Sequence, residues 1–125
     1  WYSFKPDGQT LAVIARGDKV IRLQRLSDGS LLRVLKGHTD AVLSTAFSPD
    51  GQFLASAGCD NTIRLWNVAD GQLFCTLFGH RKYVTCVAFS SDGRTLASGG
   101  YDGVIQLWDY SKVSICGSVS KKEET

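Results

Sequence analysis

The chain has 125 residues, of which 43% are hydrophobic and 21% are charged, and its formal net charge is +2. This length suits one domain rather than two, and the composition is that of an ordinary globular protein, which excludes a disordered or collagen-like chain. No apolar run approaches the ~20 residues that cross a bilayer, and the weak net charge does not by itself indicate a nucleic acid or an anionic membrane as partner.

Three sequence markers recur along the chain at intervals of about 42 residues. The first is a Phe-x-x-Asp-Gly turn, the second is a Gly-His pair and the third is an Ile-x-Leu-Trp segment. Independent markers that share one period indicate a tandem repeat, and periods of roughly 20–50 residues occur in solenoids and propellers. The copies of the three markers begin at Phe4, Phe47 and Phe89, at Gly37 and Gly79, and at Ile63 and Ile105.

Each repeat consists of short β-prone segments separated by turn residues. In the second copy we predict strands near 41–47, 53–57, 62–68 and 73–78, because these segments are rich in Val, Ile, Leu, Phe, Thr and Trp. The Ser-Pro-Asp-Gly sequence at residues 48–51 supplies the turn between the first two. No segment has a helical apolar period of useful length. Four short antiparallel strands per repeat predict an all-β fold made of β-propeller blades.

These markers are similar to those of the WD-repeat family, and the resemblance covers the chain from about residue 1 to about residue 119. It implies three four-stranded blades, which form an incomplete propeller because closed rings have roughly four to eight. We therefore expect a segment of a longer protein, or closure by oligomerisation. The expected units are a degenerate repeat with a truncated first strand at 1–36, repeats at 37–78 and 79–119 with a last strand near 115–119, and a polar tail at 120–125.

The resemblance also implies a structural hydrogen-bonded tetrad in each of the two regular repeats. The chemistry agrees, because a buried indole N–H requires an acceptor and a Ser-His-Asp relay supplies one. In the first repeat Ile14 takes the place of the serine and Gln24 that of the tryptophan. Only Asp18 remains there, so we expect no equivalent relay around Gln24. The tetrads are His38, Ser56, Asp60 and Trp66, and His80, Ser98, Asp102 and Trp108.

A catalytic reading of these residues is not favoured. Each serine lies inside a predicted strand, and no Gly-x-Ser-x-Gly elbow is present, so no catalytic residues are predicted. Cys75, His80 and Cys86 form a loose group without a fourth ligand, so we predict no metal and no other cofactor. The cysteine spacing and the absence of an Asn-x-Ser/Thr sequon predict four reduced cysteines in an intracellular protein, cytoplasmic or nuclear.

The resemblance implies a non-catalytic protein-interaction scaffold, whose partners bind the narrow top face of the propeller. Tyr83 and Tyr101, beside the basic pair Arg81-Lys82, have the composition of a binding hot spot. The alternative is that each tyrosine packs on a neighbouring loop. The predicted partner-binding residues are Ala41, Leu43, Cys59, Arg81, Lys82, Tyr83, Thr85 and Tyr101.

Two other functions stay open at this point. One is a propeller that is accessory to an enzyme domain outside this segment, and the other is an RNA-associated propeller. Residues 1–40 contain seven Lys or Arg and four Asp, which would suit an acidic partner or RNA. However, Arg22, Arg25 and Arg64 alternate with apolar residues as on the solvated face of a strand, so we expect no nucleic-acid partner and no membrane.

Overall fold

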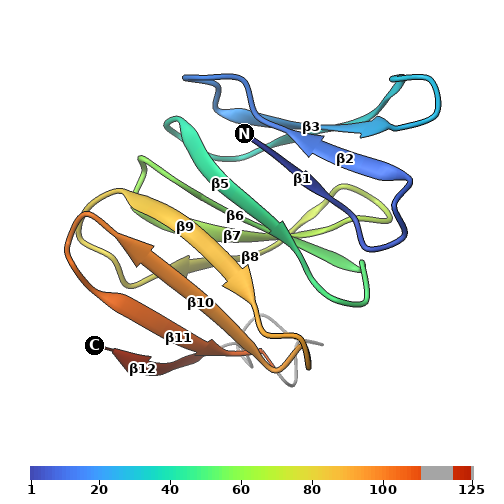
Figure 1. Ribbon diagram of the computed structural model, residues 1–125. Coiled ribbons are helices and arrows are strands. Elements are labelled where there is room, and N and C mark those ends of the chain that lie inside the picture. The colour runs from blue at the N-terminus through green and yellow to red at the C-terminus, as the bar shows by residue number, and fades with distance from the viewer. Residues whose placement is uncertain (111–119, 125) are drawn as a thin grey trace.

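The computed structural model describes residues 1–110 and the backbone of residues 120–124. These residues form twelve β-strands and no helix. The strands form three four-stranded antiparallel sheets, which lie side by side as successive layers (Figure 1). Among the described segments, no helix is long and apolar enough to cross a membrane. The predicted all-β architecture of three four-stranded repeats is therefore confirmed.

Each sheet consists of four consecutive strands whose spatial order follows their order in the chain. The strands predicted for the second repeat agree with the observed ones to within one residue at each end. The first sheet contains β1 (Tyr2–Phe4), β2 (Thr10–Val13), β3 (Val20–Arg25) and β4 (Leu31–Lys36); the second contains β5 (Val42–Phe47), β6 (Phe53–Gly58), β7 (Thr62–Asn67) and β8 (Leu73–Phe78); the third contains β9 (Val84–Phe89), β10 (Thr95–Gly100), β11 (Ile105–Asp109) and β12 (Ser120–Glu124).

The Asp-Gly turn that repeats in the sequence also repeats in the structure. In the second repeat, Asp50 Oδ1 accepts hydrogen bonds from Ser48 Oγ (2.6 Å) and from the backbone N–H of Gln52 (3.0 Å). Gly51 has a φ of 73°, a conformation that glycine adopts without steric cost. Asp92 makes the equivalent pair of bonds in the third repeat. Local turn chemistry therefore fixes how the inner two strands of these repeats pair.

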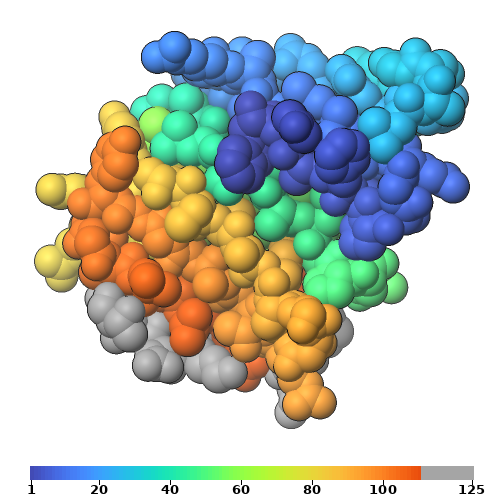
Figure 2. Space-filling view, in the orientation of Figure 1, coloured from blue at the N-terminus to red at the C-terminus, as the bar shows by residue number. Residues whose placement is uncertain are grey.

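The middle sheet is covered on both faces, which explains why all six residues of β6 are buried. Successive side chains of a strand point to opposite faces. Leu54 and Trp66 belong to the core shared with the first sheet, whereas Ala55 and Leu65 belong to the core shared with the third. Figure 2 shows the resulting stack, from the first repeat in blue to the third in orange. Among the inner strands of this stack, β5 lies between β1 and β9 and contacts both.

The first repeat differs from the others at the position of the tetrad serine. The strand register places Val13 opposite Arg22, as it places Ser56 opposite Arg64 in the second repeat. Val13, and not Ile14, therefore stands where the serine stands, so the prediction was wrong by one residue. The extra residue of this repeat lies in the turn after β2, because an insertion inside the strand would have moved its side chains to the opposite face.

The remaining tetrad positions of the first repeat form a simpler arrangement. Asp18 accepts a hydrogen bond from Arg22 Nη1 (2.8 Å). Within the described part of the chain, the side chain of Gln24 makes no hydrogen bond, so it forms no relay there. The inner strand of this repeat is instead linked to β5, because Trp1 Nε1 and Ser3 Oγ lie 3.1 and 2.8 Å from Thr45 Oγ1.

The last sheet differs from the prediction in its fourth strand. β12 occupies residues 120–124, which were predicted to form a polar tail, and it pairs with β11. The strand predicted near 115–119 lies outside the described residues. The prediction assumed that the 42-residue period continues after β11. It does not, since residues 110–119 separate β11 from β12 whereas only residues 68–72 separate β7 from β8.

The cysteines do not all have the predicted state. Cys59 is a partly buried free thiol and Cys86 is an exposed one. Cys75, on β8, is disulfide-bonded, and Cys116 lies outside the described residues. The prediction of four reduced cysteines is therefore wrong at Cys75. It rested on sequence spacing and on missing sequons, and neither reports which thiols the fold brings within bonding distance.

Candidate functional site

A chain of hydrogen bonds connects four buried or half-buried side chains of the second repeat. Trp66 Nε1 donates to Ser56 Oγ (2.8 Å), and Ser56 Oγ lies 2.6 Å from His38 Nε2. The other ring nitrogen, His38 Nδ1, lies 2.8 Å from Asp60 Oδ2. An ionised carboxylate can only accept, so Nδ1 carries the hydrogen that faces Asp60. In a neutral imidazole Nε2 is then an acceptor, and it accepts from the serine hydroxyl.

The third repeat contains the same relay with similar distances. Trp108 Nε1 donates to Ser98 Oγ (3.0 Å), which lies 2.8 Å from His80 Nε2. His80 Nδ1 lies 3.0 Å from Asp102 Oδ2. The structure therefore brings together all four predicted side chains in each of the two regular repeats.

The ionisation of the second-repeat relay follows from its burial. Burial lowers the pKa of His38 below its ordinary value of 6.5, although the neighbouring Asp60 carboxylate opposes this effect. Burial by itself would raise the pKa of Asp60, but the hydrogen bond from Thr62 and the interactions with His38 hold it below its ordinary range. Both shifts favour a neutral imidazole between the serine hydroxyl and an ionised carboxylate.

These Ser-His-Asp sets are built for rigidity and not for nucleophilic attack. Ser56 is fully buried and Ser98 is 2% exposed, so neither hydroxyl can reach a substrate. Each Oγ is also occupied by an indole donor. The relays instead tie the loop that carries each histidine to the turn that follows the second strand of its repeat. Within the described residues, no three His, Cys, Asp or Glu side chains are grouped so that they could hold a metal ion.

At the loop end that the third-repeat relay stiffens, two tyrosines and two basic residues surround an open cleft of about 260 Å³. Tyr83 precedes β9 and Tyr101 follows β10, and their ring centroids are 5.7 Å apart with the planes inclined by 34°. The backbone N–H of Tyr101 donates to the carbonyl of Tyr83 (3.0 Å). Both side chains remain open to solvent, with 43% and 69% exposure. We call this feature the Tyr-pair cleft; it is lined by Asn61, Arg81, Lys82, Tyr83 and Tyr101.

The loop that forms this cleft is held from two repeats. The backbone N–H of Arg81 donates to Asp102 Oδ2 (3.2 Å), the same oxygen that His80 Nδ1 contacts. The carbonyl of Arg81 accepts a hydrogen bond from Asn61 Nδ2 (3.2 Å), which comes from the turn of the second repeat. Sequence reasoning missed Asn61. Its signal was an asparagine at the end of a turn, a residue type that tolerates the left-handed φ of 67° found here.

The structure does not bring all the predicted partner-binding residues into this cleft. Arg81, Lys82, Tyr83 and Tyr101 line it together. The other four predicted residues are half-buried and do not line it, and the Thr85 hydroxyl donates to the carbonyl of Gly99 (3.3 Å). The four residues outside the cleft are Ala41, Leu43, Cys59 and Thr85.

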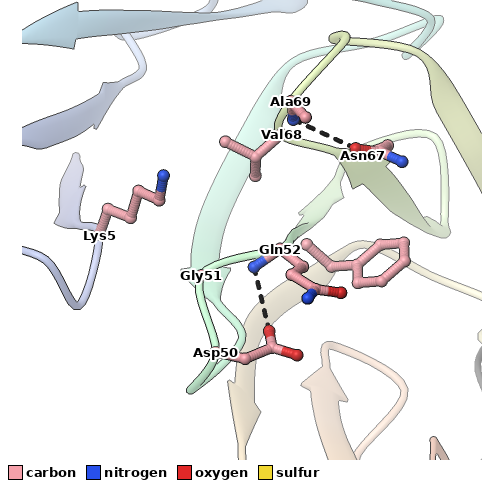
Figure 3. Close-up of a pocket in the computed structure, with 8 residues that line it drawn as sticks. Lys5, Asp50, Gly51, Gln52, Asn67, Val68 and Ala69 are labelled. Atoms are coloured by element: carbon pink, nitrogen blue, oxygen red, sulfur yellow. Dashed lines mark hydrogen bonds between the residues drawn. The ribbon is translucent and has the colours of Figure 1, made fainter.

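A second hollow, of about 430 Å³, lies between the first two repeats at the turn after β5. Figure 3 shows that its acceptors already serve the backbone: Asp50 Oδ1 accepts from the Gln52 N–H, and Asn67 Oδ1 accepts from the Ala69 N–H. Lys5 lies on the opposite wall and is 3.5 Å from Asp7 Oδ2. The groups here stabilise turns, so the Tyr-pair cleft is the better candidate for a binding site.

Comparison with known proteins agrees with this architecture. Residues 29–67 and 71–109 match the family model described as "WD domain, G-beta repeat". The chain belongs to the WD-repeat family. Among curated WD-repeat relatives, human "WD repeat and SOCS box-containing protein 1" is 46% identical over 57 residues, which are 45% of this chain and 14% of that protein. Mouse "Intraflagellar transport protein 122 homolog" is 43% identical over 58 residues, which are 46% of this chain and 5% of that protein.

Solved structures resemble nearly the whole of this WD-repeat chain. The "Structure of U3-55K" superposes with a TM-score of 0.89 and 27% identity, over 99% of this chain and 38% of that one. The "Crystal structure of RRP9 WD40 repeats" gives a TM-score of 0.88 and 27% identity, over 98% and 37% of the two chains. The chain thus spans a minor part of each of these proteins, and the stacked sheets are WD-type propeller blades.

Proposed function

We propose that this WD-repeat chain is part of a non-catalytic scaffold that binds other proteins at the end of the blades where the Tyr-pair cleft lies. The observation that carries the proposal is an exposed tyrosine pair on two loops that are hydrogen-bonded to each other, one of which is also held by Asn61 of the second repeat. A preordered loop loses little conformational entropy when a partner docks. Tyrosine provides a large contact area with a polar tip, and it is enriched in binding hot spots.

We further propose that the outer faces of the first and third sheets pack against additional blades, from the same chain or from another copy. On the first sheet, Tyr2 and Phe4 are 64% and 56% exposed, whereas Phe47, which follows Phe4 by one repeat, is 9% exposed against its neighbour. An apolar sheet face of this kind is normally covered in a folded protein. Such packing would give the loop end a rigid support of several blades.

The proposal is tested by replacing both tyrosines in the full-length protein. Tyr83→Ala/Tyr101→Ala should reduce capture of the physiological partner at least about tenfold, a loss of about 1.4 kcal/mol. The melting temperature should change little, because both side chains are exposed. Phe78→Ala is the matched control, since Phe78 is an exposed aromatic residue (74%) on the outer strand β8. Unchanged capture by the tyrosine variant, with loss of capture by Phe78→Ala, would place the partner on the side of the blades.

A further inference from the structure

We propose that the Tyr-pair cleft selects a short acidic peptide segment that carries an aromatic or apolar side chain. In this arrangement the apolar side chain packs on the tyrosine rings, and the flanking carboxylates face Arg81 and Lys82. The inference rests on the proposed function, because it names the chemistry of the partner that docks at the same site.

The positive charge at the cleft is available to a ligand. Arg81 and Lys82 are exposed, and neither forms an ion pair with any other described residue. The acidic group to which this loop is hydrogen-bonded, Asp102, is already engaged by His80 Nδ1 and by the backbone N–H groups of Arg81 and Val104. A carboxylate in the cleft would therefore gain two cations without displacing an existing partner.

The same positions of the second repeat have the opposite character. One period of 42 residues places Thr39 and Asp40 where the third repeat has Arg81 and Lys82. Asp40 is exposed, and Oδ1 accepts from the backbone N–H of Ala41 (2.8 Å). A negative environment extends to the neighbouring turn, where burial and the charges of Asp40 and Asp60 raise the pKa of the Cys59 thiol. An acidic segment is thus favoured over the third repeat and opposed over the second.

This charge distribution favours a peptide over RNA. A single strand of RNA carries a phosphate on every nucleotide, and its binding sites combine a basic groove along the backbone with bases stacked on aromatic rings. The cleft offers only two cations, and the position in the second repeat that corresponds to Lys82 holds Asp40, an exposed carboxylate. The two tyrosine rings also pack on each other, with centroids 5.7 Å apart, so in this arrangement they do not form two separate platforms for stacked bases.

Selection of peptides from a phage-displayed library of random 12-residue sequences on the immobilised full-length protein tests this inference. The wild type should enrich Asp and Glu around one aromatic or large apolar residue. Arg81→Glu/Lys82→Glu should enrich Lys and Arg instead, because the charge at the cleft is reversed. Arg16→Glu/Lys19→Glu makes the same change in net charge at exposed positions of the first repeat, and it should enrich the same acidic peptides as the wild type.

Affinities of a synthetic acidic peptide taken from that selection complete the test. Reversal of the two cleft charges should weaken its binding at least about tenfold, and Tyr83→Ala/Tyr101→Ala should do the same. The inference would be overturned if the selected peptides had no acidic bias, or if charge reversal left that bias unchanged. It would also be overturned if the cleft bound poly(U) in place of peptide in a way that depends on Arg81. If the tyrosine variant still loses its physiological partner in that case, the proposed function survives. If acidic peptides bind the cleft but the cleft variants capture the physiological partner as well as the wild type does, the proposed function alone fails.

Discussion

Removal of one hydroxyl group should reveal how much the buried relay stabilises the blades. Ser56→Ala deletes the oxygen that accepts from Trp66 Nε1 and that donates to His38 Nε2. The two groups left behind cannot turn to solvent, because Trp66 is 1% and His38 is 6% exposed. Each buried polar group without a partner costs about 1–3 kcal/mol, so for these two groups we expect the free energy of unfolding to fall by about 2–6 kcal/mol.

A double-mutant cycle separates this effect from simple loss of packing. Trp66→Phe removes the indole donor, so Ser56→Ala should cost about 1–2 kcal/mol less in that background than in the wild type. The assay is urea unfolding of the full-length protein, followed by circular dichroism because one variant lacks a tryptophan. Ser27→Ala, at an exposed turn position, serves as control and should stay within about 0.5 kcal/mol of the wild type. Equal costs in both backgrounds, or a Ser56→Ala variant as stable as the control, would refute the reasoning.

Burial lowers the pKa of His38, so as the pH falls below about 6.5 the unfolded chain binds a proton before the folded protein does. The stability contributed by neutral His38 is therefore complete above that pH and is lost on acidification. Melting temperatures measured from pH 8 to pH 5 should decrease, and they should decrease more in the wild type than in His38→Gln. Asn61→Ala removes the hydrogen bond that holds the cleft loop and should weaken peptide or partner binding by about 3–10-fold, measured by calorimetry, since one such bond contributes about 1 kcal/mol. In a thiol assay on the denatured, non-reduced protein, Cys59 and Cys86 should react, and Cys75 should react only after reduction; labelling of Cys75 without reduction would contradict the bonded state.

Much of the architecture was predictable because its determinants are local and repeat. The turn around Asp50 is closed by side chains two residues apart, so its sequence is sufficient to place the two strands that it joins. The relay residues were also identifiable, because the resemblance to the WD-repeat family implied them at positions that this sequence matches, with Ser56 and Trp66 on strands. A buried indole N–H needs a hydrogen-bond acceptor, and the sequence shows whether a side chain that can accept is present at the matching position.

The features that escaped sequence reasoning depend on contacts between segments. The contact of Tyr83 with Tyr101 depends on the backbone hydrogen bond that joins their two loops. Asn61 matters only because the neighbouring repeat brings a carbonyl to its amide. The position of Val13 was missed because an inserted residue has no location in an alignment until the strand register is known. The disulfide bonding of Cys75 likewise reflects proximity in space, which spacing along the chain does not report.

The central claim, that a partner docks at the loop end of the third repeat, is tested most directly by amide hydrogen exchange of the full-length protein with and without its partner. We predict slower exchange on binding at residues 81–83 and 101–104, with little change along β4 and β8, the outer strands of the first two sheets. Protection confined to those outer strands, with exchange at the Tyr-pair cleft unchanged, would contradict the claim.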